Sequence, residues 1–590
     1  MKGTPVRRDS TDLAIVALIA AAGLTVTLWM AASASALLSG HRPPRLALVD
    51  GLRAFSHPGD PAAAWRAPVG PAPLYWTLTA GCLVLAALAV YLGRKVWSGH
   101  SHSTAEDPES VEGLATRQQV RRVAGPQALT ANAATLRPSL TKAKPGDVGY
   151  RLGSARSTGC WASVEDSIIV LGPPRSGKGH NLVIPMILDS PGAVVTTSTR
   201  PDNLAVSFDA RSRVGPVAVF DPESLTAGAR VLPTTRWSIV RGCERAQTAM
   251  RRAAALVADT NRSGVENGAF WTQQTLSVVR CLLHAAALDG RGPADLHRWS
   301  HGAARAKEAV AVLARHPDAT PGWESALDAA ISADPRTRDS VWAMVANTFA
   351  ALADPAVLEV VSPPEGKEFD PRRFLAERAT LYLLGTASGA SATANLVAAF
   401  VEDVVDTARH MAAASAGARL APPLGLILDE AANYALPSLP SLLSEGGGSG
   451  ITTVTVLQSL SQARDRWGRE AAGAIWDSAI VKVALGGSAS ADDLADISRL
   501  IGDREVEEWS ETVGGAGTGR SMSMSRRTRP ILEPAAIRQI PTGFGLLLLR
   551  SAPPIMLRLT PWTTRPDAKD LATARRELEA SMAAAAKANR

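Results

Sequence analysis

The chain has 590 residues, of which 46% are hydrophobic and 20% charged, and its formal net charge is +7 at pH 7. This length exceeds what a single hydrophobic core organises and indicates about three or four structural units. The mild positive charge permits a polyanionic partner without requiring one. The four cysteines are scattered and form no CxxC pair, so neither a disulfide framework nor a zinc site is indicated.

Two uncharged segments near the amino end predict a membrane anchor over residues 1–95. Residues 13–40 and 67–93 each exceed the ~20 residues that a transmembrane helix needs. A secretory signal is the alternative for the first segment, because basic residues precede it and Ala-Ser-Ala triplets resemble cleavage sites. The polar composition of residues 96–147 then predicts a juxtamembrane linker.

The segment SIIVLGPPRSGKGHNLVIP, residues 167–185, predicts a strand, a glycine-framed loop and a helix. The loop matches GxxxxGK, whose glycines let backbone N–H groups close around phosphate oxygens while the lysine reaches the β- and γ-phosphates. A glycine turn with a solvated lysine is the alternative. The predicted ATP-binding residues are Gly172, Pro173, Pro174, Arg175, Ser176, Gly177, Lys178 and Gly179.

One position of this loop departs from the usual pattern. The Ser or Thr that ordinarily follows the lysine and holds Mg²⁺ is replaced by Gly179. We therefore expect the metal to depend on a distant carboxylate and on waters.

The first part of the nucleotide-binding domain is predicted over residues 148–240, with further strands at 193–197 and 216–220. Residues 241–375 are alanine-rich, with apolar residues three and four apart, which is typical of helices. The sequence thus predicts an all-α domain inserted into an α/β core. The second part of the core is expected over residues 376–562, beginning with a strand at 380–384.

The run LGLILDEAANY predicts a buried strand that ends in Asp429 and Glu430, the Walker B pattern. Asp429 is expected to bind the hydrated Mg²⁺ ion through its waters, and Glu430 is expected to orient or deprotonate the attacking water. A solvated strand end is the alternative for this motif taken alone. We expect Lys178 and the Asp429–Glu430 pair to converge on one triphosphate across adjacent strands.

A β-branched run, residues 451–456, leads to Gln458, which at the end of the strand beside Walker B can hydrogen-bond the γ-phosphate. A helix-capping role is the alternative for Gln458. Further strands are predicted at 479–485 and 543–550. Between them, the Gly/Ser/Arg-rich residues 514–530 predict a loop or an exposed hairpin, and residues 563–590 predict a charged helical or disordered tail.

Taken together, these motifs resemble the TraG/TraD-like coupling ATPases of type IV secretion and conjugation. The resemblance covers residues 149–562 and includes GPPRSGKG, FDPES, the Phe270-Trp271 pair, LILDEAANY, VLQSLSQ and the closing RRTRPILEPAAIRQIPTGFGLLLLR. It implies a RecA-like P-loop NTPase that assembles as a homo-hexamer. It also implies a multi-pass protein of the inner membrane, with a cytoplasmic ATPase domain that passes relaxase-bound, single-stranded DNA to a secretion channel.

Two further departures qualify the resemblance. Relatives commonly carry an Asp-Pro-Lys-Gly-Glu-like stretch where this chain reads TTSTRPD, residues 196–202. Many relatives also have an arginine, a candidate to reach the neighbouring subunit's nucleotide, where residues 444–450 read SEGGGSG. A trans-acting arginine strongly accelerates phosphoryl transfer, so its absence implies slow hydrolysis or another donor. The other candidate donors are Arg464, Arg466, Arg499 and Arg504.

Two other functions remain open from the sequence. The first is an FtsK-like double-stranded DNA translocase. The helical insertion and the lack of a carboxyl-terminal winged-helix module argue against this alternative. The second is a nucleotide-binding membrane scaffold with little turnover, which Gly179 and the missing arginine favour.

Overall fold

The computed structural model of the chain describes residues 10–45, 53–100, 107–226, 229, 231–258, 268–385, 393–512 and 521–588. These residues form two compact units, which divide between Glu106 and Asp107.

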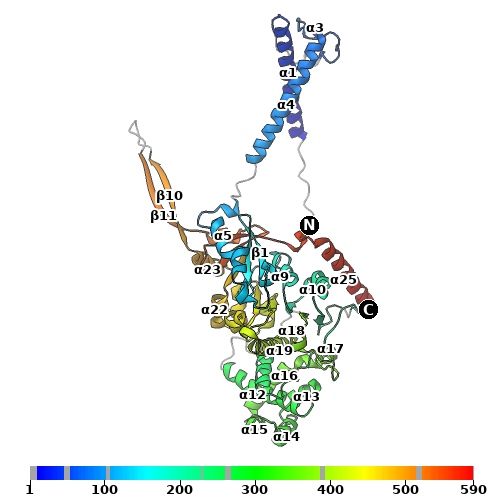
Figure 1. Ribbon diagram of the computed structural model, residues 1–590, viewed down its shortest axis with the longest axis vertical. Coiled ribbons are helices and arrows are strands. Elements are labelled where there is room, and N and C mark those ends of the chain that lie inside the picture. The colour runs from blue at the N-terminus through cyan, green and yellow to red at the C-terminus, as the bar shows by residue number, and fades with distance from the viewer. Residues whose placement is uncertain are drawn as a thin grey trace. The chain divides into compact units, whose positions relative to one another are not determined.

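The amino-terminal unit consists of helices α1 (Ser10–Leu38), α3 (Pro61–Trp65) and α4 (Ala72–His100). Helices α1 and α4 pack side by side (Figure 1). A small apolar cluster includes Leu28, Trp65 and Tyr75, and Trp65 Nε1 donates a hydrogen bond to Tyr75 Oη at 3.1 Å. The two long helices therefore form a hairpin that has a small core of its own.

The two predicted transmembrane helices are not supported by this structure. Neither helix of the hairpin, nor any other in the described part of the chain, combines the length and hydropathy that a membrane span needs. The described side chains of α1 and α4 cover residues 24–38 and 72–88. Each of these ranges is shorter than the ~20 residues that cross a bilayer. Residues 13–23 and 89–93 of the predicted segments lie outside the described side chains.

The second unit is built on an eleven-stranded mixed sheet with the order β2-β1-β13-β12-β9-β3-β8-β7-β4-β6-β5. From β9 to β5 every neighbouring pair is parallel, and from β2 to β9 every pair is antiparallel. The predicted α/β class is confirmed. The strands are β1 (Gly149–Ala155), β2 (Thr158–Ser163), β3 (Ile168–Leu171), β4 (Val194–Ser198), β5 (Val217–Phe220), β6 (Thr380–Leu384), β7 (Leu424–Leu428), β8 (Ile451–Leu457), β9 (Val481–Leu485), β12 (Phe544–Leu549) and β13 (Ile555–Leu559).

The parallel strands are buried on both faces, as their continuous apolar or β-branched sequences require. Every residue of β3, β4, β6, β7 and β8 is buried. The helices that contact strands of the sheet include α9 (Ile184–Asp189), α10 (Asp202–Ser212), α20 (Leu439–Glu445), α21 (Leu460–Trp467) and α24 (Pro534–Arg538). Helices α19 (Thr393–Ala413), α22 (Arg469–Ser478) and α23 (Ala491–Ile501) contribute to the same hydrophobic core as β3.

A helical segment separates β5 from β6, and no strand interrupts it within its described residues (Figure 1). Trp299 and Trp342 are buried there, and Trp342 Nε1 donates to the Trp299 carbonyl oxygen at 3.4 Å. The helices are α11 (Ala246–Val257), α12 (Gly268–Leu288), α13 (Pro293–Ser300), α14 (Lys307–Arg315), α15 (Trp323–Ile331), α16 (Pro335–Thr348), α17 (Pro355–Val360) and α18 (Pro371–Ala376).

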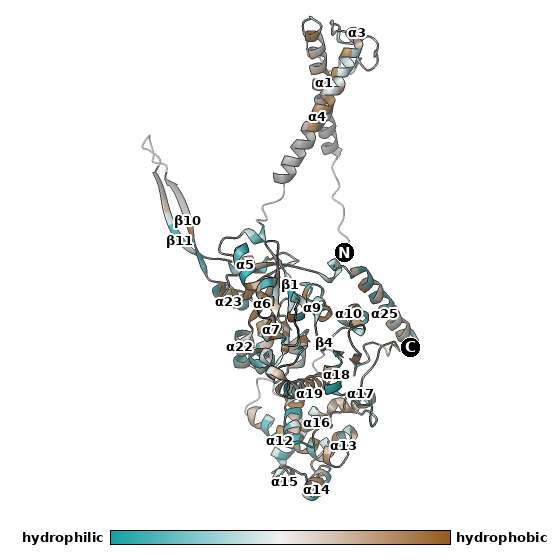
Figure 2. Ribbon diagram, in the orientation of Figure 1, coloured by the Kyte–Doolittle hydropathy of each residue, from teal (hydrophilic) through white to brown (hydrophobic). Residues whose placement is uncertain are grey.

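Residues 521–530 of the Gly/Ser/Arg-rich region form one strand of a hairpin, as one of the two sequence alternatives predicts. Strand β10 (Asp503–Thr512) pairs with β11 (Ser521–Pro530), and the two strands project from the rest of the unit (Figure 1). Figure 2 shows hydrophilic residues along the described part of the hairpin, where Arg526, Arg527 and Arg529 are exposed or partly exposed.

The first and last described segments of the unit form helices that pack against the sheet or its helices. Thr116 and Gln119 form a reciprocal capping box at the start of α5 (Arg117–Ala124), followed by α6 (Pro126–Ala131). The tail forms α25 (Ala568–Ala588), which packs on α10 and buries Leu571 and Leu578. Of the two alternatives for the tail, the structure has the helix.

A fully buried arginine, Arg211, connects α10 by hydrogen bonds to β6 and to the segment between α9 and β4. Arg211 of α10 donates from Nε to Thr380 Oγ1, and from its two terminal nitrogens to the carbonyl oxygens of Ser190 and Gly192, each at 2.8 Å. Burial lowers the pKa of Arg211. Its three partners are neutral, so the network depends on complete hydrogen bonding.

We expect Arg211→Ala to lower the free energy of unfolding by about 2–4 kcal/mol, because it leaves buried carbonyl and hydroxyl oxygens unsatisfied. Arg213→Ala is the matched control, since its exposed pair with Asp209 contributes at most about 0.5 kcal/mol. Chemical denaturation followed by tryptophan fluorescence measures both. Equal stability of the two variants would contradict a structural role for the buried network.

Candidate functional site

The loop that follows β3 has the backbone geometry of a phosphate-binding loop. Gly172 N donates to the Leu457 carbonyl oxygen at 3.0 Å, and Arg175 and Gly177 adopt positive φ angles of 66° and 83°. A Cβ atom at Gly177 would lie 2.6 Å from Asn181 Nδ2, so the turn requires glycine. A helical stretch starts directly after the loop, with a π-helical turn over Gly179–Val183 that leads into α9. Backbone N–H groups at such a helix start favour an anion.

Lys178 and the Walker B pair come together, as predicted. Lys178 Nζ donates to the Gly172 carbonyl oxygen at 3.2 Å. Burial lowers the pKa of Lys178, while the nearby Asp429 and Glu430 carboxylates raise it. An ammonium group and two carboxylates thus share one region at the end of the sheet.

The predicted adjacency of the two motif strands is wrong, because β8 lies between β3 and β7. All three strands are parallel, so their carboxyl ends share one edge despite the intervening strand. Gln458 follows β8 directly, and Leu171 of β3 is in register with Leu457. Gln458 therefore lies level with the start of the phosphate loop, between Lys178 and Asp429 in strand order.

Asp429 is held by two polar contacts and has one unsatisfied oxygen. Asn203 Nδ2 donates to Asp429 Oδ2 at 3.1 Å, and Thr197 Oγ1 donates to the Asp429 carbonyl oxygen at 2.9 Å. Burial raises the pKa of Asp429 to about 6, and the neighbouring Glu430 adds to this shift. Within the described residues, the buried Oδ1 atom has no hydrogen-bond partner. A hydrated divalent cation would satisfy such an oxygen, so the residues present fit Mg²⁺.

Glu430 is oriented by its backbone and by two donors. Its φ angle is 52°, a left-handed conformation that is unusual for a residue with a side chain. Its Oε2 atom accepts from Thr199 Oγ1 at 2.7 Å and from Asn433 Nδ2 at 3.1 Å. The carboxylate is thereby fixed beside the site, as a water-orienting group has to be.

Thr199 and Asn203 are site residues that the sequence reasoning missed. Both follow β4, which pairs with β7 in the sheet, and their side chains bond to Glu430 and Asp429. The signal in the sequence is the polar run TTSTRPDN, which begins in the last three residues of β4 and continues into α10. Its role cannot be predicted from the sequence, because the sequence does not show that β4 and β7 are neighbours.

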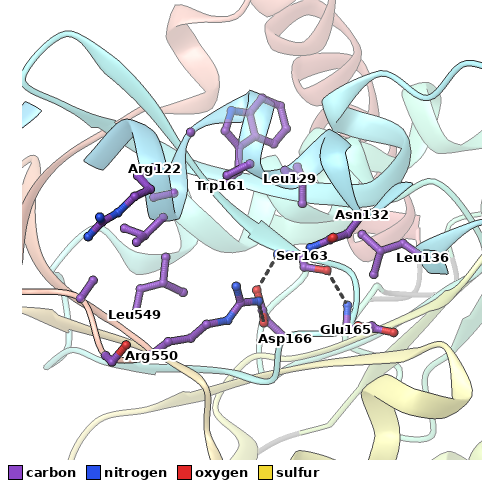
Figure 3. Close-up of a pocket in the computed structure, with 16 residues that line it drawn as sticks. Arg122, Leu129, Asn132, Leu136, Trp161, Ser163, Glu165, Asp166, Leu549 and Arg550 are labelled. Atoms are coloured by element: carbon purple, nitrogen blue, oxygen red, sulfur yellow. Dashed lines mark hydrogen bonds and ion pairs between the residues drawn. The ribbon is translucent and has the colours of Figure 1, made fainter. Parts of the chain in front are cut away.

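Two cavities lie at opposite edges of the sheet. One, of about 450 Å³, borders the phosphate loop and extends to Gly486, Arg538 and Phe544. The other, of about 260 Å³, lies beside Trp161 at the amino ends of the parallel strands (Figure 3). There Asp166 pairs with Arg550 at 2.7 Å. Only the first cavity is positioned to adjoin a nucleotide bound at the loop.

Three of the arginines considered as trans donors have carboxylate partners within the chain. Arg464 lies 3.6 Å from Asp493, and Arg504 lies 3.4 Å from Glu112. Arg499 forms an ion pair with Asp496. Each of these side chains would have to leave its carboxylate in order to reach a neighbouring subunit.

Comparison with known proteins agrees with this geometry. Residues 423–542 match the family described as the TraM recognition site of TraD and TraG. The conjugal transfer protein TraG of Rhizobium radiobacter is 26% identical over 144 residues, which are 24% of this chain and 22% of that protein. The predicted resemblance to coupling proteins is confirmed. The chain matches about a fifth of the length of this curated relative.

Solved structures extend the likeness to most of the chain. The bacterial conjugative coupling protein TrwBdeltaN70, in an unbound form, is 18% identical with a TM-score of 0.53, over 74% of this chain and 92% of that one. The plasmid coupling protein TrwB in complex with ADP and Mg²⁺ is also 18% identical, with a TM-score of 0.51, over 74% and 93% of the two chains. At this identity the likeness shows the fold, which is the RecA-like P-loop α/β fold.

The raised pKa of Asp429 predicts a pH-dependent cation site. Only the ionised carboxylate binds a cation, so the affinity for Mn²⁺ in the presence of an ATP analogue should fall up to about tenfold per pH unit below about pH 6. Calorimetric titration between about pH 5 and pH 8 measures this change.

Asp429→Asn is the control for this titration. The nucleotide's own protonation is the same in both proteins, so the difference between their pH profiles isolates the Asp429 carboxyl group. Identical profiles would show that Asp429 does not bind the cation.

Proposed function

We propose that this chain is an ATP-driven coupling protein that delivers DNA, or relaxase-bound DNA, to a type IV secretion channel. The observation that carries the proposal is the placement of Lys178 beside Asp429 and Glu430 at the carboxyl ends of the parallel strands. The phosphate loop and the coupling-protein fold support it. Single-stranded DNA is the proposed form of the cargo.

In the proposed ATP site, the loop from Gly172 to Gly179 surrounds the phosphates and Lys178 neutralises their charge. Asp429 holds a hydrated Mg²⁺, which would neutralise charge that develops on the phosphoryl oxygens. Glu430 orients the attacking water, and Gln458 contacts the γ-phosphate from the end of β8. Structures of TrwB with ADP and Mg²⁺, and with a non-hydrolysable ATP analogue, support this choice of ligands.

The arrangement of the rest of the chain is also a proposal. Residues 1–95 anchor the protein in the inner membrane, and the subunits form a homo-hexamer. Residues 96–147, predicted as a juxtamembrane linker, connect the anchor to a cytoplasmic ATPase and include helices α5 and α6, which pack on its core. Residues 241–375 form the inserted domain between the two parts of the ATPase, 148–240 and 376–562, and residues 563–590 are the tail. Figure 2 shows hydrophobic residues along the described part of α4, which supports an anchoring role.

A nucleotide-gated scaffold is the second candidate function. It is favoured by Gly179 and by the helical segment Gly446–Ser449, which lacks the arginine of many relatives. A scaffold would bind ATP without hydrolysing it, whereas a translocase would hydrolyse ATP faster when DNA is added.

We expect the full chain in lipid nanodiscs to hydrolyse ATP, and single-stranded DNA to raise the rate more than duplex DNA does. Lys178→Ala should reduce the rate at least about 100-fold, because it removes a positive charge from the phosphates. Lys307→Ala, on the exposed face of α14, is the control and should leave the rate unchanged. Steady-state phosphate release measures all three proteins.

The same assay separates the alternatives. DNA stimulation should weaken as salt rises, because backbone phosphate contacts release counterions. ATP binding without hydrolysis at any DNA concentration would favour the scaffold. Stronger stimulation by duplex than by single strands would favour an FtsK-like translocase.

A further inference from the structure

The space beside Gly179 contains an oxygen atom from another element. A Cβ atom placed on Gly179 would lie 3.7 Å from Asn203 Oδ1, which is an ordinary van der Waals distance. Among the other described residues, apart from the two chain neighbours of Gly179 and the backbone of its own helix, no further heavy atom lies within 4 Å of that position. Asn203 Oδ1 thus lies beside the place from which a Ser or Thr side chain would project in the usual phosphate loop.

The orientation of the Asn203 amide follows from its partner. Asn203 is in the first turn of α10 and is 2% exposed. Its Nδ2 atom donates to Asp429 Oδ2 at 3.1 Å. A carboxylate only accepts hydrogen bonds, so the amide nitrogen faces Asp429 and the amide oxygen faces Gly179. Within the described residues, no donor hydrogen-bonds to Asn203 Oδ1.

An amide oxygen is a suitable replacement for the missing hydroxyl. Mg²⁺ prefers oxygen ligands, and a neutral amide oxygen can take the place of the neutral hydroxyl oxygen of a Ser or Thr. Asn203 connects the two parts of the site, because its nitrogen bonds to Asp429 while its oxygen faces the end of the phosphate loop. The unpartnered Oδ1 atom of Asp429 belongs to the same buried group.

We propose that Asn203 Oδ1 supplies the oxygen contact to the hydrated Mg²⁺ that the Ser or Thr hydroxyl supplies in the usual phosphate loop. One metal contact that the usual phosphate loop makes would here come from the start of α10. This inference rests on the proposed ATPase function. The absence of a Ser or Thr at position 179 then does not reduce the number of protein oxygens at the metal site, because Asp429 and Asn203 each supply one.

The test measures the Mg²⁺ concentration that half-saturates binding of a fluorescent ATP analogue to the full chain. Asn203→Ala should raise this concentration about tenfold or more, by analogy with the loss of outer metal-site partners. Binding of the analogue without Mg²⁺ should not change. Asn347→Ala is the control, because Asn347 is an exposed asparagine of α16 and makes none of the site contacts described above. It should leave the Mg²⁺ dependence unchanged.

Rescue by a hydroxyl group is the decisive comparison. Gly179→Ser places a hydroxyl in the usual position, where a Cβ atom fits without a clash. In the double variant Asn203→Ala/Gly179→Ser, the half-saturating Mg²⁺ concentration should return to within about threefold of the wild-type value. Loss of Mg²⁺ affinity in Asn203→Ala without rescue by Gly179→Ser would show that Asn203 only positions Asp429, and would overturn the proposal.

Asn203→Asp provides a second test that does not depend on the alanine variant. It keeps an oxygen at the proposed metal contact but removes the donor to Asp429. Mg²⁺ dependence within about threefold of the wild type supports the metal contact. A loss as large as the one expected for Asn203→Ala would indicate a positioning role and overturn it.

Two outcomes separate this inference from the proposed function. Mg²⁺-dependent binding in the wild type that Asn203→Ala leaves unchanged overturns the Asn203 contact alone. A wild-type chain with no Mg²⁺-dependent nucleotide binding overturns the ATPase function together with this contact.

Discussion

The parallel alignment of four central strands is the constraint on which the site depends. Strands β3, β8, β7 and β4 are neighbours in that order and end at one edge of the sheet. Lys178, Gln458, Asp429, Thr199 and Asn203 all lie in the segments that leave this edge. Residues far apart in the sequence are therefore positioned by backbone pairing in a buried sheet, rather than by the loops alone.

The buried edge also determines the electrostatics of the site. Desolvation raises the pKa of the Asp429 carboxyl group and lowers that of the Lys178 ammonium group, so each charge is less favourable than in water. A triphosphate and a divalent cation would add charges opposite to those of Lys178 and Asp429. Within the described residues one buried oxygen of Asp429 has no hydrogen-bond partner, which leaves it available to a cation or to the waters of that cation.

The sequence predicts those parts of the site that local patterns encode. The phosphate loop, the Walker B strand and the apolar strands have their own signatures over a few residues. Strand order has no such signature, so the position of β8 between β3 and β7 was predicted wrongly. The roles of Thr199 and Asn203 depend on the pairing of β4 with β7, and polar residues after a strand do not reveal their partners. The strands β1, β2 and β13 of the antiparallel part of the sheet were also missed, since β1 and β2 have short sequences of mixed polarity and β1 pairs with β13 from the far end of the unit.

The carboxyl-terminal helix shows a similar dependence on distant contacts. Helix α25 is rich in alanine and carries few large apolar residues, and its sequence alone suggested no packing. In the structure, Leu571 packs with Ile184, Val206 and Trp562, so the tail contacts both α9 and α10. Helix α10 carries Asn203, and α9 continues from the phosphate loop. Helix α25 therefore packs against the two helices whose residues lie beside Gly179. The position of Asn203 relative to Gly179 thus depends on contacts made by a helix far away in the sequence.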